Sequence, residues 1–95
     1  MAAYVIVNVT VTDPDGYQSY RDAVSSNIMA YGGSYVVRGG EVEVLEGKHD
    51  GSRLVILMFP TIDQAKRWWN SPEYAEIKKL RKGNAKFDAF VVDGT

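Results

Sequence analysis

The sequence has no cysteine and only one histidine. The lack of cysteine excludes disulfides, thiolate metal sites and a cysteine nucleophile, and it fits a reducing compartment, so we expect a cytoplasmic protein. A single histidine supplies too few ligands for a histidine-based metal site and does not indicate a Ser-His-Asp triad. This residue, His49, lies in a predicted turn, where an exposed loop side chain is more common than a catalytic base. We therefore expect neither a metal nor a cofactor.

The chain also lacks a strong charge of one sign and a long hydrophobic run. Its formal net charge is −1, so no global basic field favours nucleic acid. The one basic cluster, "KKLRKGNAK", falls at the end of a predicted helix, where cations complement the helix dipole. The N-terminal "MAAYVIVNVTVTDPDG" has no basic region and alternates apolar with polar residues. We expect neither a signal peptide nor a membrane span, and no binding to nucleic acid or membrane.

Apolar residues are plentiful: 45 % of the 95 residues are hydrophobic and 12 % are aromatic. This content is enough for a packed core and argues against disorder. The length and the absence of an internal linker predict a single domain over residues 1–95.

The first third of the chain predicts a strand followed by a helix. Alternating β-branched residues place Val5, Val7, Val9 and Val11 on one face of a strand. Asp13 and Pro14 are typical of a helix start. A helical stripe then follows, and Gly32 is a natural stop; the stripe comprises Tyr17, Tyr20, Val24, Ile28 and Tyr31.

The remaining two thirds predict three further strand regions and a broken helix. Residues 34–38 and 41–46 are predicted to be extended, with a bulge or kink at Gly39-Gly40, and Asp50-Gly51 is a hairpin signal. "RLVILMFP" is predicted as a strand that is apolar on both faces. Two short helical segments follow, capped at Thr61 and Ser71, and the second is expected to end at Gly83. "AKFDAFVVDG" is the last predicted strand.

This order, β-α-β-β-α-β, predicts an α+β ferredoxin-like fold with a four-stranded antiparallel sheet and its helices on one face. The other face would meet water, yet the strands carry apolar residues on both sides. The simplest cover is a second copy of the chain, so we expect a homodimer through the sheet face. The alternative is that a loop or the C-terminal segment covers part of this face.

Three stretches carry a resemblance to a known family. "YGGSYVVRGGEVEVLEG", "FPTIDQAKRWWNSPEYAEIKKLR" and the terminal "VVDG" resemble domain-of-unknown-function family 1330, within the dimeric α+β barrel superfamily. The resemblance covers nearly the whole chain and implies a ferredoxin-like protomer in a sheet-to-sheet dimer. It implies no particular reaction, because relatives in the superfamily range from cofactor-independent monooxygenases to stress-responsive proteins without known chemistry.

The glycine pairs around Arg38 do not have the spacing of a phosphate-binding loop. Arg38 itself is a candidate ligand-binding residue. Under unbroken alternation it would share an apolar face with Val36, Val42 and Val44, where a guanidinium needs a partner. That partner could be a carboxylate in a structural ion pair or an anionic ligand; a bulge at the glycines could instead leave Arg38 in solvent.

Aromatic residues supply the other ligand-binding candidates, which are Tyr20, Trp69 and Tyr74. Adjacent Trp68 and Trp69 cannot both point inward, so one is expected to rim a cleft between helices and sheet. Asp93 and Glu46 lie nearest to strand ends and are the candidate general bases. An alternative interpretation makes the aromatics a tyrosine-rich core only.

Two functions therefore stay open at this point. The first is a small-molecule-binding domain for an anionic or aromatic ligand, with or without cofactor-independent catalysis, whose pocket lies between helices and sheet. The second is a non-catalytic homodimeric structural or interaction module.

Overall fold

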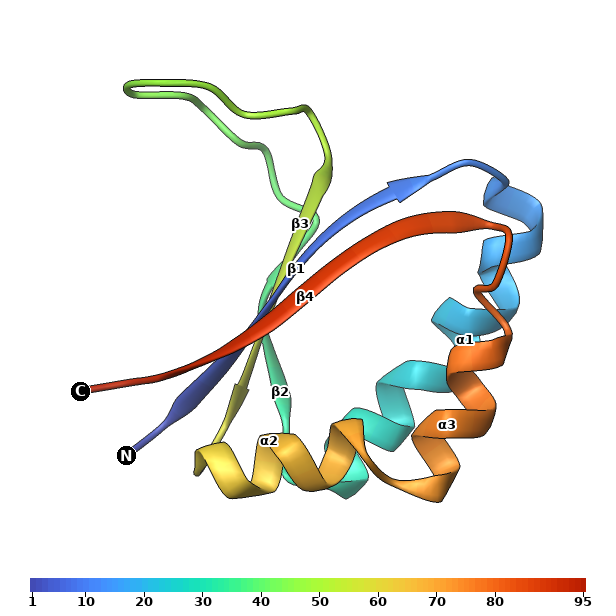
Figure 1. Cartoon of the computed structure of the whole chain (residues 1–95), viewed down its shortest axis with the longest axis vertical. Helices are drawn as coiled ribbons and strands as arrows, with labels where there is room; N and C mark the ends of the chain where they lie inside the picture. Colours follow the sequence, from blue (N-terminus) through green and yellow to red (C-terminus); the bar gives the residue numbers. More distant parts are fainter.

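The computed structural model describes residues 1–95 as a four-stranded sheet with three helices against one face (Figure 1). The elements follow the order β1, α1, β2, β3, α2, α3 and β4. Their bounds are Ala3–Val11 (β1), Pro14–Ala30 (α1), Ser34–Arg38 (β2), Arg53–Phe59 (β3), Ile62–Trp69 (α2), Pro72–Lys79 (α3) and Ala85–Asp93 (β4). This is the predicted ferredoxin-like arrangement, with the second helical region broken into two helices as expected.

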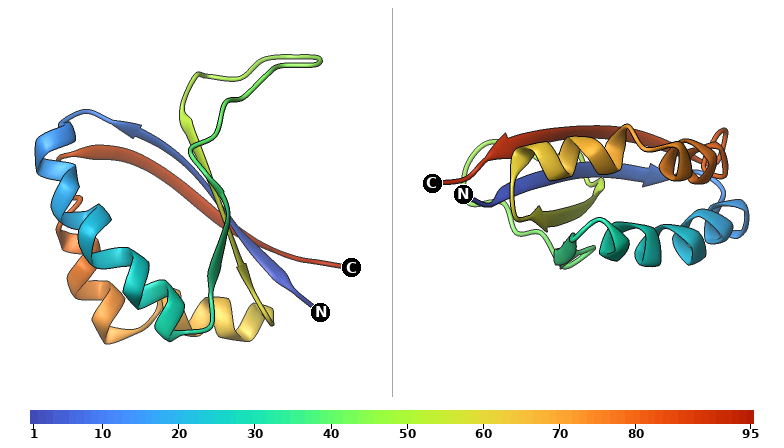
Figure 2. Two further views of the ribbon diagram at one scale, coloured as in Figure 1. Left: turned by 180° about the vertical axis from the view of Figure 1, so that it is seen from behind. Right: turned by 90° about the horizontal axis from the view of Figure 1, so that it is seen from below.

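The sheet is antiparallel throughout, with strand order β2-β3-β1-β4. The first strand, β1, therefore lies in the interior between β3 and β4. Because β1 pairs with β4 over its full length, the two chain ends meet: Ala3 lies opposite Asp93, and the Gly94 amide donates to the Ala2 carbonyl. Figure 2 shows the termini side by side, with all three helices on one side of the sheet.

Each helix begins where the sequence predicts a cap. The side chains of Asp13, Thr61 and Ser71 accept hydrogen bonds from backbone amides in the first turns of α1, α2 and α3, at 3.1–3.2 Å. Gly32 ends α1 with φ +85°, and the Gly33 amide donates to the carbonyl of Ile28, as in a Schellman motif. Local signals in the sequence thus place the start of each helix and the end of α1.

The core lies between the helices and the inward face of the sheet. Its members are the alternate residues of the strands and the predicted stripe of α1, together with Trp68 and Tyr74 from α2 and α3. Trp68 is 2 % exposed, stacks on Phe59 at 5.5 Å between ring centroids, and donates from Nε1 to Asn27 Oδ1 at 2.8 Å. Trp69, the next residue, is only half-buried and packs at the edge of the core, so the two tryptophans are not buried equally, as expected.

The outward face of the sheet carries two apolar rows that cross all or most of the strands. In the register of the sheet, Ile6 lies between Ile56 and Phe90, and Tyr4 lies between Met58 and Val92. Val37 extends the first row onto β2. Phe90 is 54 % exposed and Val92 is 47 % exposed. No helix or loop of the protomer covers these rows, in agreement with the sequence pattern.

The predicted strand over residues 41–46 is wrong. Residues 39–51 are exposed and form an arm that leaves the sheet between β2 and β3. The Gly39 amide still donates to the Leu54 carbonyl of β3 at 2.9 Å, but no residue of the arm is part of a strand. Val42 and Val44 have strand propensity but no neighbouring strand, and propensity alone does not make a strand. The arm bends at residues 45–47, not at Asp50-Gly51, where Asp50 Oδ1 instead accepts from the Ser52 amide. In Figure 1 and the left view of Figure 2, the arm projects away from the helices.

Two smaller predictions are also corrected. The bulge in β2 lies between Tyr35 and Val37, ahead of the Gly39-Gly40 pair where it is predicted. Gly39 has φ +72° and ends the strand, because the chain turns there into the arm. The last helix ends at Lys79, ahead of Gly83, which has φ +78° in the following turn.

Candidate ligand-binding site

A cavity of about 250 Å³ lies between α1 and the sheet. Its walls are largely apolar because the inward residues of β1 and β3 face the buried stripe of α1. The valines of β1 are small, while α1 presents tyrosines, so the two layers do not close completely. Its apolar lining comprises Val7, Val9, Tyr17, Tyr20, Val24, Ile28, Tyr35, Val55, Leu57, Trp68 and Phe87.

Arg38 lies at this cavity and not on the outward face of the sheet. The bulge in β2 reverses the alternation, so Arg38 pairs with Val55 and points to the helix side with Tyr35. Its guanidinium carbon lies 4.4 Å from the centre of the Tyr35 ring, and Nη2 donates to Ser25 Oγ at 3.1 Å. No carboxylate of the chain forms an ion pair with it, since the one salt bridge joins Lys79 to Glu76. A structural ion pair within the protomer is therefore excluded.

Tyr20 also lines the cavity, whereas Tyr74 lies behind it. The two hydroxyls are hydrogen-bonded at 2.8 Å, and Tyr74 has no exposed surface. Burial away from water raises the pKa of the Tyr20 hydroxyl far above its usual value, and the neighbouring Tyr74 adds to this shift. Tyr20 therefore stays protonated and neutral as a wall of the cavity.

Removing the Tyr20 hydroxyl tests this buried pair. We expect Tyr20→Phe to lower the free energy of unfolding by about 1–3 kcal/mol, because the buried Tyr74 hydroxyl is left without its partner. The substitution should also change the pH dependence. An unfolded tyrosine loses its proton near about pH 10, while folded Tyr20 keeps it, so the contribution is fully present below about pH 10 and is lost as the pH rises further.

Urea unfolding at pH 8 and at pH 10.5 measures both effects. The wild-type protein should lose about 1.4 kcal/mol more per pH unit above about pH 10 than Tyr20→Phe. An equal alkaline loss in both proteins would show that Tyr20 ionises normally in the folded state.

The other predicted site residues lie elsewhere. Trp69 lines a second, smaller cavity of about 160 Å³ between α2 and the sheet, and Lys78 Nζ lies 4.4 Å from the centre of its ring. Asp93 is exposed at the end of β4, and Glu46 is exposed at the bend of the arm; neither lines either of these two cavities. The structure thus brings Arg38 and Tyr20 together and leaves the two candidate bases outside.

Two cavity residues that the sequence analysis missed are Arg21 and Arg53. Arg53 has the same parity as Val55 and Leu57, so the alternation of β3 already places it on the inward face. Arg21 adjoins Tyr20 at the edge of the α1 stripe. Both signals were present in the sequence, but charged residues at the boundary of an apolar stripe usually mark the surface.

The structure contains no group of three or more histidine, cysteine, aspartate or glutamate side chains placed to hold a metal ion. None of its helices combines the length and apolarity needed to cross a bilayer.

Solved structures with this fold include proteins of known and unknown activity. A protein of unknown function from Rhodopseudomonas palustris superposes with a TM-score of 0.74 at 18 % identity, over 99 % of this chain and 82 % of its own. SnoaB, a cofactor-independent oxygenase from Streptomyces nogalater, has a TM-score of 0.64 at 10 % identity, over 99 % and 93 % of the chains. A dimeric ferredoxin-like protein of unknown function from Thermobifida fusca has a TM-score of 0.65 at 14 % identity, over 99 % and 92 %.

At these identities the similarity establishes the fold alone. No curated protein is similar in sequence to this chain. The family described as Domain of unknown function (DUF1330) matches residues 2–95. Because this match spans nearly the whole chain, the protein belongs to the DUF1330 family.

Proposed function

We propose that the protein is a homodimer in which each protomer binds a small molecule in the cavity between α1 and the sheet. The observation that carries the proposal is an open, mainly apolar cavity with a guanidinium at its mouth that has no carboxylate partner. An apolar pocket with a few converging polar groups is the usual form of a small-molecule site.

Arg38 and Tyr20 have different roles in this proposal. Arg38 binds an anionic group of the ligand, and its stacking on Tyr35 together with the bond to Ser25 holds the guanidinium in place. Tyr20 forms part of the wall, while Tyr74 fixes its hydroxyl from behind. Trp69 would act only on a ligand in the second cavity, and Asp93 and Glu46 are left without a role.

The proposal is one of binding, without an assigned reaction. The only carboxylate that lines the cavity is that of Asp22, which is exposed and accepts a hydrogen bond from Gln18 Nε2. A desolvated general base is therefore lacking among its lining residues. Since SnoaB shares the fold, cofactor-independent catalysis is compatible with this architecture. A cytoplasmic location also belongs to the proposal, because a cysteine-free chain needs no oxidising compartment.

The homodimer rests on the outward face of the sheet. Two apolar rows there lie in register across the strands and are uncovered in the protomer. The arm, residues 39–51, projects on the same side, so a second chain on this face would lie against it (Figure 1). Its exposed Val42, Val44 and Leu45 would then lose contact with water. Ferredoxin-like proteins from Bacteroides fragilis and Thermobifida fusca are described as dimeric.

A thermal-shift screen of small carboxylates and aromatic acids tests the binding proposal. We expect compounds that raise the melting temperature of the wild-type protein to protect Arg38→Ala less, because the anion loses a charged hydrogen-bond donor. Arg67→Ala is the matched control, since Arg67 is exposed on α2 and does not line the cavity. Equal protection of all three proteins would show that Arg38 does not bind the ligand. A screen without any hit would contradict the proposal itself.

A further inference from the structure

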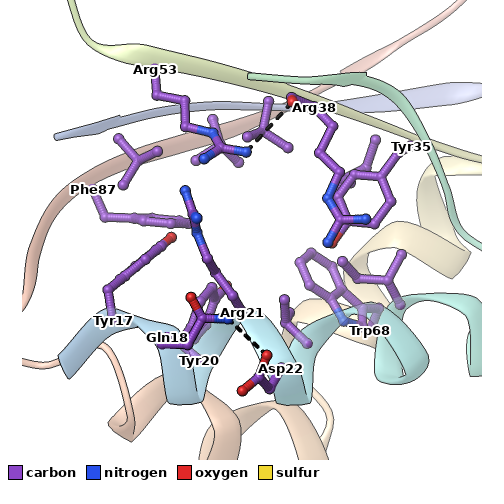
Figure 3. Close-up of a pocket in the computed structure, with 16 residues that line it drawn as sticks. Tyr17, Gln18, Tyr20, Arg21, Asp22, Tyr35, Arg38, Arg53, Trp68 and Phe87 are labelled. Carbon is purple, nitrogen blue, oxygen red and sulfur yellow. Dashed lines mark hydrogen bonds between the residues drawn. The ribbon is translucent and has the colours of Figure 1, made fainter. Parts of the chain in front are cut away.

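The mouth of the cavity holds three arginines that come from three different elements. Arg21 belongs to α1, Arg38 ends β2 and Arg53 begins β3, and all three line the cavity. Figure 3 shows Arg21 rising from the helix and Arg53 reaching down from the sheet toward it, with Arg38 across the cavity. The arrangement joins parts of the chain that are distant in sequence.

The positive charge of the three arginines is not neutralised by other residues of the protomer. The lining has three guanidiniums and one carboxylate, Asp22, so its formal charge is 3 − 1 = +2, in a chain whose net charge is −1. No ion pair neutralises any of the three arginines. Like charges around one cavity repel one another, and an anion bound in the cavity would offset that repulsion.

Gly39 is part of the same arrangement. A Cβ at this position would collide with the guanidinium of Arg53, whose Nη2 contacts the Arg38 carbonyl at 3.5 Å. The glycine, with its positive φ, leaves the space in which Arg53 turns toward the cavity. The "RGG" segment therefore supplies one guanidinium and makes room for another.

Below the arginines, the aromatic walls of the cavity favour a ligand with a flat, apolar part. Rings of Tyr17, Tyr20, Tyr35, Trp68 and Phe87 surround the space. Its volume of about 250 Å³ is below the range of about 300–1,000 Å³ that is usual for drug-sized ligands. One ring or two fused rings fit this space better than a larger polycyclic body.

We propose that the ligand is a planar aromatic carboxylate of one or two rings, whose carboxylate is bound by Arg21, Arg38 and Arg53 jointly. The fork of a guanidinium matches a carboxylate in a bidentate manner, and aromatic walls offer the ring stacking and edge contacts. This inference rests on the proposed binding function and specifies its ligand class.

Isothermal titration calorimetry with 2-naphthoate and its neutral counterpart 2-naphthamide tests the ligand class. We expect naphthoate to bind more tightly than the amide. Added salt should lower the affinity for naphthoate and leave the affinity for the amide unchanged. Arg21→Gln, Arg38→Gln and Arg53→Gln should each weaken naphthoate binding about 10- to 100-fold, the range for hydrogen bonds to charged groups. Arg67→Gln should leave it unchanged. Lysine at each position, which keeps the charge but not the fork, should restore part of the affinity.

Each contrary result has a different meaning. If acid and amide bind equally and the glutamine variants match wild type, the arginine assignment is wrong while the cavity still binds ligands. If neither compound nor any other ring compound binds, the proposed function fails as well. If inorganic phosphate displaces naphthoate at equal concentration, the site is one for phosphate and the carboxylate assignment is wrong. If the variants shift only the monomer–dimer equilibrium, the arginines pair with a second chain and the inference is overturned.

Discussion

Phe90→Lys is expected to convert the protein from a dimer to a monomer at micromolar concentration. Phe90 lies in the apolar row that crosses the outward face, beside Ile6, and is 54 % exposed in the protomer. In a two-fold dimer the substitution occurs twice. Each copy loses about 1.5–3 kcal/mol of apolar burial and also places an ammonium group in the interface. The dimer dissociation constant should therefore rise at least about 100-fold.

Light scattering and sedimentation equilibrium measure this effect. Met29→Lys is the matched control, because Met29 is 61 % exposed on α1, on the helix side of the protein. The control should remain dimeric. Circular dichroism should show that both variants keep the fold, since neither side chain belongs to the protomer core. A Phe90→Lys protein that stays dimeric, or a wild-type protein that is monomeric, would refute the sheet-face interface.

Trp68→Ala is expected to be the most destabilising single substitution in the core. Trp68 packs on Phe59, Trp69 and Tyr74, with ring centroids 4.4–5.8 Å apart. It is also the hydrogen-bond donor to Asn27, which joins α2 to α1. Removal of a buried tryptophan costs about 3–5 kcal/mol, which is a large part of the total stability of a domain this small.

Thermal and urea unfolding followed by circular dichroism measure this loss. For a domain of this length, about 1 kcal/mol corresponds to about 4–8 °C, so the melting temperature should fall by at least about 12 °C. Trp69→Ala is the comparison. Because Trp69 is only half-buried, its substitution should lower the free energy of unfolding clearly less. Equal losses in the two variants would mean that the core does not depend on Trp68 in the manner described.

Much of the fold follows from local signals in the sequence. The alternation of Val5 to Val11 fixes which face of β1 is inward. The caps at Asp13, Thr61 and Ser71 place the starts of the three helices, and the stop at Gly32 places the end of α1. These features depend on residues close together in the chain, and for that reason they are readable without a structure.

Features that depend on contacts between residues far apart in the sequence cannot be predicted in the same way. The arm has the composition of a strand, but a strand needs a partner at the right distance. The bulge at residues 35–37 decides that Arg38 faces the helices, and nothing in the segment itself indicates a bulge there. Trp69 and Asp93 were grouped with Arg38 on general grounds, yet α2 and the end of β4 hold them away from the cavity.

The glycines around Arg38 do more than end a helix and interrupt a strand. Gly32 ends α1, whereas Gly39 both turns the chain into the arm and accommodates the Arg53 side chain. This second function depends on a contact between strands β2 and β3, so it could be found only in the folded chain.

The central claim, that the cavity binds an anionic aromatic ligand through its arginines, is tested most directly by nuclear magnetic resonance of the arginine side chains. The chain has five arginines, Arg21, Arg38, Arg53, Arg67 and Arg81, so their Nε–Hε signals can be assigned individually by substitution. During titration with 2-naphthoate, the signals of Arg21, Arg38 and Arg53 should shift together along one saturable curve, while that of Arg67 stays fixed. If naphthoate saturates the protein and these three signals do not move, the account of the site is contradicted.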